Sequence, residues 1–113
     1  MKTTIYHNPR CSTSRKALEM MRDAGLEPEI VEYLQQPPSR TRLRQLIRDA
    51  GLQVREAMRT KEPLFKELGL GDASDSQLLD AMVEHPILIE RPFVETAKGV
   101  RLGRPVERVL EVL

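Results

Sequence analysis

The pattern of apolar and polar residues changes several times along this chain, and each change predicts a new element. Residues 3–6 favour an extended strand, which Asn8-Pro9 ends. Apolar residues then recur at helical spacing as far as Gly25, a residue that commonly ends a last turn. Residues 29–34 predict a second strand. A strand, a helix and a strand of these lengths predict a βαβ unit with parallel strands.

The middle of the chain has the apolar spacing of helices. Residues 39–50, 62–68 and 75–84 place apolar side chains three or four positions apart, and a glycine or proline follows each segment. Ser74 or Asp72 is expected to cap the last of these helices. The 113 residues are enough for one domain. We therefore predict a single domain, residues 1–113, with a helical insertion at about 39–85.

The last third returns to β-forming residues. The wholly apolar run 87–89 predicts a short strand at a sheet centre. Residues 93–96 and 100–102 predict a hairpin. A final helix is expected from Pro105, and its buried stripe would consist of Val106, Val109, Leu110 and Leu113. The fold class that this order predicts is α/β, with a mixed sheet flanked by helices: βαβ, helical insertion, ββα.

Composition excludes several classes of partner. Lys and Arg total 18 against 17 acidic residues, and there are two Tyr, two Phe and no Trp, so we expect no nucleic-acid partner. No apolar run has the roughly 18 residues of a membrane span and no signal-peptide pattern is present, so we expect no membrane partner. A lone cysteine forms no internal disulfide, which favours a reducing cytoplasm. No metal site is expected, because no metal-ligand spacing is present.

That cysteine, Cys11, marks the candidate site. It falls between the first predicted strand and the first predicted helix, among polar residues, with Ser12, Thr13 or Ser14 available to cap the helix. The N–H groups of a first helical turn favour a thiolate and bind anions. We therefore expect Cys11 to be a reactive nucleophile. His7, when protonated, would stabilise its thiolate, and the Ser14 hydroxyl would donate to the sulfur.

Three arginines differ from the rest because each lies at a junction between predicted elements. They are Arg59, Arg91 and Arg104. Arg91 and Arg104 each precede a proline, and the Arg91-Pro92 turn is a candidate for a cis peptide. Three guanidinium groups at one thiolate would form an oxyanion site. The spacing of these residues does not show that they converge.

Together these segments resemble the ArsC family of arsenate reductases, of the type that depends on glutathione and glutaredoxin. The resemblance extends over nearly the whole chain and rests on the segments 5–15, 66–70, 85–92 and 103–105, together with Arg59. It implies a thioredoxin-like fold with a helical insertion and a cis proline at Pro92. It also implies roles: Cys11 as nucleophile, His7 and Ser14 as the residues that help to hold its thiolate, and the three arginines as the oxyanion ligands.

The resemblance further implies the reaction and its partners. Cys11 attacks the arsenic of arsenate or a similar oxyanion, glutathione attacks the covalent adduct as thiol co-substrate, and glutaredoxin resolves the mixed disulfide as arsenite leaves. No tightly bound cofactor is implied, and we expect a monomer. With a single cysteine in the chain, the second sulfur must come from outside.

Two other functions stay open at this point. The first is a glutaredoxin-like monothiol oxidoreductase that deglutathionylates proteins, which would turn over a glutathionylated substrate without any oxyanion. The second is an Spx-like regulator that binds RNA polymerase. Such regulators commonly carry a Cys-x-x-Cys switch, whereas Ser14 occupies the second position here and forms no disulfide.

Overall fold

The computed structural model describes residues 3–113, and the chain divides into two compact units. The first unit comprises Met1–Gln36 and Arg91–Leu113, and the second comprises Pro37–Glu90. The first contains β1 (Thr4–His7), α1 (Ser12–Asp23), β2 (Glu29–Glu32), β3 (Phe93–Thr96), β4 (Gly99–Leu102) and the 3₁₀ helix η4 (Val106–Val112). The second contains α2 (Arg40–Asp49), η1 (Val54–Ala57), α3 (Pro63–Glu67), η2 (Leu70–Asp72), α4 (Asp75–Glu84) and η3 (Pro86–Leu88). The expected helical insertion falls within the second unit; that the whole chain forms one domain stays a prediction.

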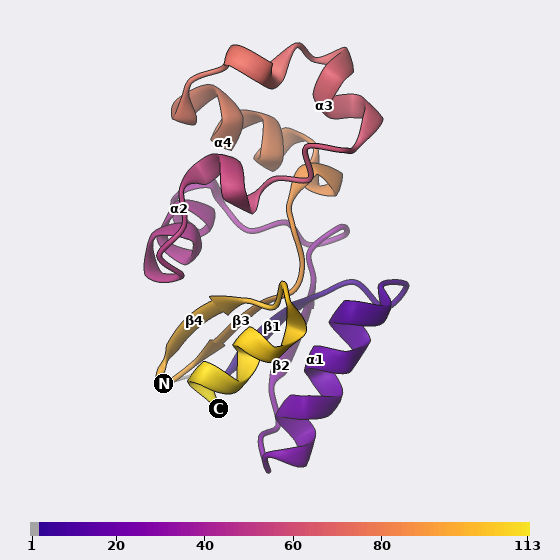
Figure 1. Ribbon diagram of the computed structural model, residues 1–113, viewed down its shortest axis with the longest axis vertical. Coiled ribbons are helices and arrows are strands. Elements are labelled where there is room, and N and C mark those ends of the chain that lie inside the picture. The colour runs from indigo at the N-terminus through magenta and orange to yellow at the C-terminus, as the bar shows by residue number, and fades with distance from the viewer. Residues whose placement is uncertain (1–2) are drawn as a thin grey trace. The chain divides into compact units, whose positions relative to one another are not determined.

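The four strands of the first unit form one mixed sheet in the order β2-β1-β3-β4 (Figure 1). β1 and β2 pair in parallel, with Ile5 opposite Ile30, while β3 pairs antiparallel with both β1 and β4. The predicted βαβ unit and the predicted hairpin are therefore both confirmed. The second strand is shorter than expected, since β2 ends at Glu32.

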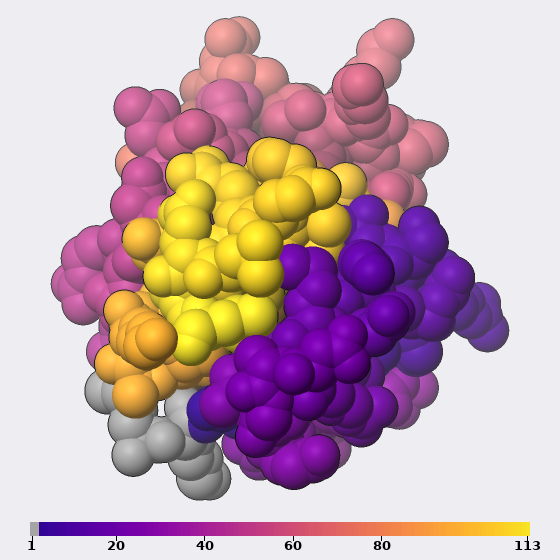
Figure 2. All heavy atoms as spheres, turned by 60° about the horizontal axis from the view of Figure 1, so that its bottom comes forward, coloured from indigo at the N-terminus to yellow at the C-terminus, as the bar shows by residue number. Residues whose placement is uncertain are grey.

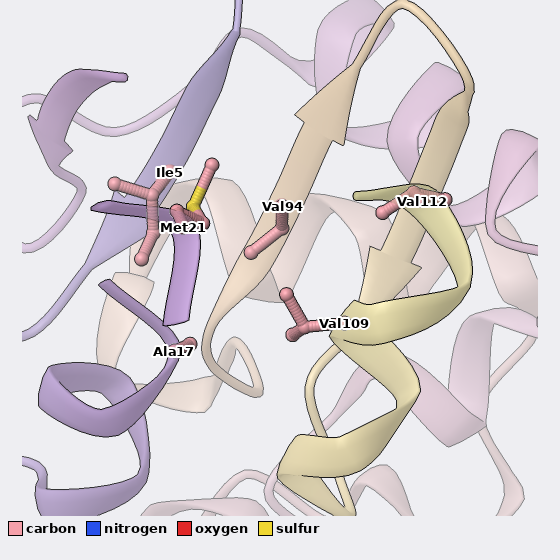
Figure 3. Packing of buried hydrophobic residues seen from close by; sticks show 6 residues of the cluster. All are labelled: Ile5, Ala17, Met21, Val94, Val109 and Val112. Carbon is pink, nitrogen blue, oxygen red and sulfur yellow. The ribbon is translucent and has the colours of Figure 1, made fainter. Parts of the chain in front are cut away.

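The core of the first unit lies between one face of the sheet and two helices, α1 and η4. Ile5 and Val94 are paired across β1 and β3, so their side chains point to the same face. Ala17 and Met21 are four residues apart on α1 and meet that face together. The buried cluster is Ile5, Ala17, Met21, Val94, Val109 and Val112 (Figure 3). In Figure 2, η4 (yellow) lies directly against α1 (purple).

Two arginine-proline loops flank the hairpin and are packed against each other at Gly103. The Gly103 N–H donates to the Pro92 carbonyl oxygen at 2.9 Å. A Cβ added to Gly103 would lie 3.0 Å from Val109 Cγ2 and 3.2 Å from Pro92 Cγ, so no side chain fits here without displacing its neighbours. The peptide bonds before Pro92 and Pro105 are both cis. The cis proline that the resemblance implied at Pro92 is confirmed.

The helices of the second unit begin where the sequence predicted. The Ser39 hydroxyl accepts the Arg42 N–H at the start of α2, and Ser74 forms a capping box with Gln77 at the start of α4. Arg40 joins these two helices through a 2.7 Å ion pair with Asp80. Their inner faces are wholly apolar: Leu43, Leu46, Ile47, Leu78, Leu79 and Met82 are buried.

Two predictions for the last third are wrong. Residues 87–89 form no strand: η3 spans Pro86–Leu88, Ile87 is 41% exposed, and only Ile89 forms an isolated bridge, with Met58. The final helix forms after Pro105 as expected, but the assignment of Leu110 to its buried stripe is wrong, because it is a 3₁₀ helix, whose period of three residues differs from the 3.6 of an α-helix. It therefore buries Val109 and Val112 and leaves Leu110 60% exposed.

Candidate active site

Cys11 lies at the end of a tight turn that links β1 to α1. The Cys11 N–H donates to the Asn8 carbonyl oxygen at 3.0 Å, and Pro9 and Arg10 occupy the two central positions. Proline favours the first of these positions, and the Asn8 side-chain oxygen accepts the Arg10 N–H at 3.0 Å, so the local sequence specifies the turn. The turn makes Cys11 the N-cap residue of α1. The side chain is only 9% exposed.

The surroundings of Cys11 favour its thiolate. Burial raises the pKa of the Cys11 thiol, but it is outweighed by the N–H group of Ser14, by the charge and hydrogen bond of Arg91, and by the N–H group of Thr13. The pKa therefore lies below its ordinary value. The two N–H donors belong to the first turn of α1, which is the stabilisation that the sequence predicted for this helix end.

Arg91 and Arg104, the two predicted site arginines of the first unit, are connected to each other and reach the sulfur. The Arg104 Nη2 group donates to Cys11 Sγ at 3.8 Å, and its Nε group donates to the Arg91 carbonyl oxygen at 2.9 Å. The Arg91 backbone therefore orients the Arg104 guanidinium. Arg104 and Cys11 are 93 residues apart in sequence, and the pairing of β1 with β3 brings their segments together.

The Ser14 hydroxyl points to the turn. It therefore neither caps α1 nor donates to the Cys11 sulfur, the two roles that the sequence suggested. Its Oγ atom lies 2.6 Å from His7 Nδ1 and accepts the Asn8 N–H at 3.1 Å. Neither Ser14 nor its neighbours cap α1 with a side chain, so the predicted hydroxyl cap is wrong. The Ser14 group that hydrogen-bonds to the sulfur is its backbone N–H.

The structure also favours a different charge state of His7 from the one that the sequence suggested. Burial lowers the pKa of His7, Glu32 raises it, and Arg15 and Arg22 lower it again, with a net decrease. The neutral imidazole is therefore favoured, whereas the sequence suggested a cation beside the thiolate. A neutral, buried His7 acts on the turn through its hydrogen bond to Ser14.

Arg59 belongs to the second unit, and acidic side chains surround it there. Its Nη1 atom lies 3.2 Å from Glu62 Oε2, and its Nε atom lies 3.8 Å from Glu90 Oε1. Its N–H donates to the Leu88 carbonyl oxygen at 2.8 Å, which fixes the backbone. The structure thus brings five of the six predicted site residues together in the first unit, and the convergence of Arg59 with them stays a prediction.

Sequence reasoning missed three residues that shape these surroundings. Asn8 holds the turn through its side chain and its carbonyl group, and the Asn-Pro pair that ended the first strand was the available signal. Glu62 and Glu90 pair with Arg59, and of these only Glu62, three residues away, was within reach of a local pattern. Within residues 3–113, no cluster of His, Cys, Asp and Glu is able to hold a metal, and no helix is long and apolar enough to cross a membrane.

Comparison with known proteins gives a consistent result. The model of the ArsC family matches residues 6–112. An arsenate reductase from Rhizobium meliloti is 60% identical over 115 residues, which cover 100% of this chain and 82% of that protein. One from Escherichia coli is 51% identical over 112 residues, covering 97% of this chain and 79% of that protein. A solved arsenate reductase from Vibrio cholerae superposes with a TM-score of 0.94 at 49% identity, covering 100% of this chain and 98% of that one. These matches confirm the expected thioredoxin-like fold.

Proposed function

Because the chain belongs to the ArsC family, we propose that it is an arsenate reductase whose nucleophile is Cys11. The observation that carries this proposal is the sulfur's surroundings: two helix N–H groups and two guanidinium groups next to a thiol whose pKa is lowered. Such a site holds an anionic nucleophile ready to react with a tetrahedral oxyanion. The named relatives, at 51 and 60% identity, agree with arsenate as that oxyanion.

The first step forms a sulfur–arsenic bond. The Cys11 thiolate attacks arsenic, and one arsenate oxygen accepts a proton and leaves as hydroxide or water. Arg91 and Arg104 stabilise the negative charge on the remaining oxygens, because their guanidinium groups already lie at the sulfur. Arg59 serves as the third oxyanion ligand in this proposal.

The reduction itself takes two electrons from two external thiols. Glutathione attacks the arsenic of the covalent adduct, forms a second arsenic–sulfur bond and displaces an oxygen as water. Glutaredoxin then attacks the glutathione sulfur, so that a mixed disulfide forms and the electron pair of the broken arsenic–sulfur bond stays on arsenic, which becomes arsenic(III). Water finally hydrolyses the bond between arsenic(III) and the Cys11 sulfur, so arsenite leaves and Cys11 is a thiolate again, and the two external thiols have together lost two electrons and two protons. External thiols are required because the chain has one cysteine. This chemistry needs no bound cofactor and suits a reducing cytoplasm.

His7 and Ser14 have a positioning role in this proposal. The Ser14 hydroxyl links the His7 ring to the Asn8 N–H, and so ties the end of β1 to the first turn of α1. This arrangement keeps the Ser14 N–H directed at the Cys11 sulfur. A neutral His7 suits the role, since a second buried charge would add a desolvation cost.

The test is NADPH consumption in an assay coupled through glutathione, glutathione reductase and glutaredoxin, with arsenate as substrate. The wild-type protein should reduce arsenate, and Cys11→Ser should fall to background. Ser12→Ala is the matched control, because Ser12 is exposed and caps nothing, and it should retain wild-type activity. Absence of arsenate turnover in the wild type would contradict the proposal. Turnover of a glutathionylated substrate without oxyanion would instead favour the monothiol oxidoreductase.

A further inference from the structure

A second feature of the first unit lies beside the Cys11 turn, and most of the residues that line it have no role in the mechanism above. It is a pocket of about 160 Å³ at the carboxyl ends of β1 and β2, which we call the β1–β2 pocket. His7 and Glu32 are register partners at these two strand ends, and both line it. Ligands of α/β sheets bind outside the carboxyl ends of parallel strands. Cys11 follows the same end of β1, so the pocket and the thiol share one edge of the sheet.

One of the residues that line the pocket is adjacent to the nucleophile in sequence. Arg10, which immediately precedes Cys11, is exposed and lines the pocket. Consecutive Cα atoms are about 3.8 Å apart, so a molecule whose sulfur is near Cys11 reaches the pocket with an arm about two residues long. At roughly 30 Å³ per water molecule, the pocket has room for a short polar arm of a ligand.

The lining groups show which kind of arm fits. Arg10 supplies a guanidinium group, Glu32 a carboxylate and Gln35 an amide, while Leu34 provides an apolar wall. A guanidinium group recognises a carboxylate, and a carboxylate recognises an ammonium group. Opposite charges around one small pocket therefore match a zwitterionic α-amino acid group.

Glutathione has such a group at one end only. Its γ-glutamyl end carries both an ammonium and a carboxylate, whereas its glycine end carries a carboxylate alone. A lone carboxylate would face Glu32 with like charge, which disfavours the glycine end. The arm from the glutathione sulfur to the α-carbon of its γ-glutamyl group also has a length of about two residues, which matches the arm needed to reach the pocket.

We propose that the β1–β2 pocket binds the γ-glutamyl end of glutathione, with Arg10 on its carboxylate and Glu32 on its ammonium group, while the glutathione sulfur approaches Cys11. This inference rests on the proposed function, because it concerns the thiol co-substrate of that reaction. It assigns Arg10 and Glu32 to thiol specificity and leaves arsenate binding to other residues.

The kinetic test compares three thiols: glutathione, γ-glutamylcysteine and cysteinylglycine. In the wild type, the KM of γ-glutamylcysteine should stay close to that of glutathione, and the KM of cysteinylglycine should be about tenfold higher, the effect of one lost charge-assisted contact. Arg10→Gln and Glu32→Gln should each raise the KM of glutathione about tenfold and leave the KM of arsenate unchanged. Lys16→Gln and Glu19→Gln, which alter an exposed ion pair on α1 outside the pocket, are the matched controls.

Binding of S-methylglutathione, which has no free thiol, separates this inference from the proposed function. Its affinity for the wild-type protein should fall about tenfold in Arg10→Gln. Loss of that binding in Arg10→Gln, in a protein without arsenate turnover, would support the pocket and contradict the proposed function. Arsenate turnover with equal KM values for cysteinylglycine and γ-glutamylcysteine, or with an unaffected glutathione KM in both variants, would overturn the pocket assignment and leave the proposed function intact.

Discussion

Arg104 and Arg59 are expected to have the same role, yet their surroundings differ. Arg104 contacts the Cys11 sulfur, and a backbone carbonyl group orients it. Arg59 lies in the second unit and pairs with two carboxylates, those of Glu62 and Glu90. The first arginine faces an anionic nucleophile, and the second faces groups that already neutralise its charge.

In the proposed mechanism, this difference separates the groups that stabilise the thiolate, which lie in the first unit, from Arg59, the proposed oxyanion ligand of the second unit. Every group that lowers the pKa of Cys11 belongs to the first unit: the N–H groups of Ser14 and Thr13, and Arg91. An oxyanion that binds Arg59 has to compete with Glu62 and Glu90 for the guanidinium group.

Arg104→Lys should have the largest effect. Lysine keeps the charge but loses the planar geometry that spans the Arg91 carbonyl oxygen and the Cys11 sulfur. We expect kcat/KM for arsenate to fall on the order of a hundredfold, as for the loss of one oxyanion donor. Steady-state kinetics in the coupled assay measures this. Arg108→Lys, on exposed surface of η4, is the control and should change nothing. Equal kcat/KM values for arsenate in both variants would show that Arg104 is not part of the site.

Arg59→Gln tests the arginine of the second unit, which pairs with carboxylates. We expect the KM of arsenate to rise about tenfold, through loss of one charged hydrogen-bonding group, and the pKa of Cys11 to stay unchanged, because Arg59 is not among the groups that shift it. Glu90→Gln should lower the KM of arsenate, since it removes one of the two carboxylates that compete for Arg59. A shift of the Cys11 titration in Arg59→Gln would show that the division between the units is wrong.

Gly103→Ala should disturb the arginine loops without removing a charge. Its Cβ would press against Val109 and Pro92, and the Pro92 loop carries Arg91. We expect kcat/KM to fall severalfold and unfolding to become easier by about 1–3 kcal/mol, as for overpacking. Gly71→Ala is the control, because a Cβ there meets no atom within 4 Å and Gly71 has no positive φ. Steady-state kinetics and thermal unfolding of both variants measure these two effects. Equal kcat/KM values and equal melting temperatures in the two variants would contradict the tight fit at Gly103.

The smallest expected effect is a change in the pH dependence of stability. The pKa of His7 is lower in the folded state than in the unfolded chain, so the unfolded chain binds more protons as the pH falls through 6.5, the value of an ordinary histidine. His7 therefore makes stability decrease on acidification from neutral pH. In His7→Asn, the melting temperature should decrease less between pH 7 and pH 5 than it does in the wild type. His85→Asn, at the end of α4, is the control. A profile as steep in His7→Asn as in the wild type would contradict the neutral, buried state of His7.

The elements that the sequence predicted correctly are those with local signals. The β-forming residues around Ile5, the helical spacing of Ala17 and Met21, and the cap at Ser74 are properties of short segments, and the structure confirms them. The turn before Cys11 was recognisable for the same reason, because Asn-Pro favours a turn.

The predictions that failed required information beyond a short segment. An apolar run of three residues is consistent with a strand or with a turn. Ile89 forms an isolated β-bridge only because Met58 lies beside it. Leu110 was assigned to the core on a period of 3.6, which a 3₁₀ helix does not follow. The approach of Arg104 to Cys11 depends on tertiary structure, and so does the use of the Ser14 hydroxyl by His7.

Titration of Cys11, followed by the ultraviolet absorbance of its thiolate, measures whether its surroundings lower the pKa of the thiol. The chain has a single cysteine, so the signal belongs to one group. We expect a midpoint below that of a free cysteine thiol, and a higher midpoint in Arg91→Gln, because Arg91 supplies both a charge and a hydrogen bond to the sulfur. A wild-type midpoint at or above that of free cysteine would show that burial dominates at Cys11, and would contradict the proposal of a thiolate prepared for arsenate.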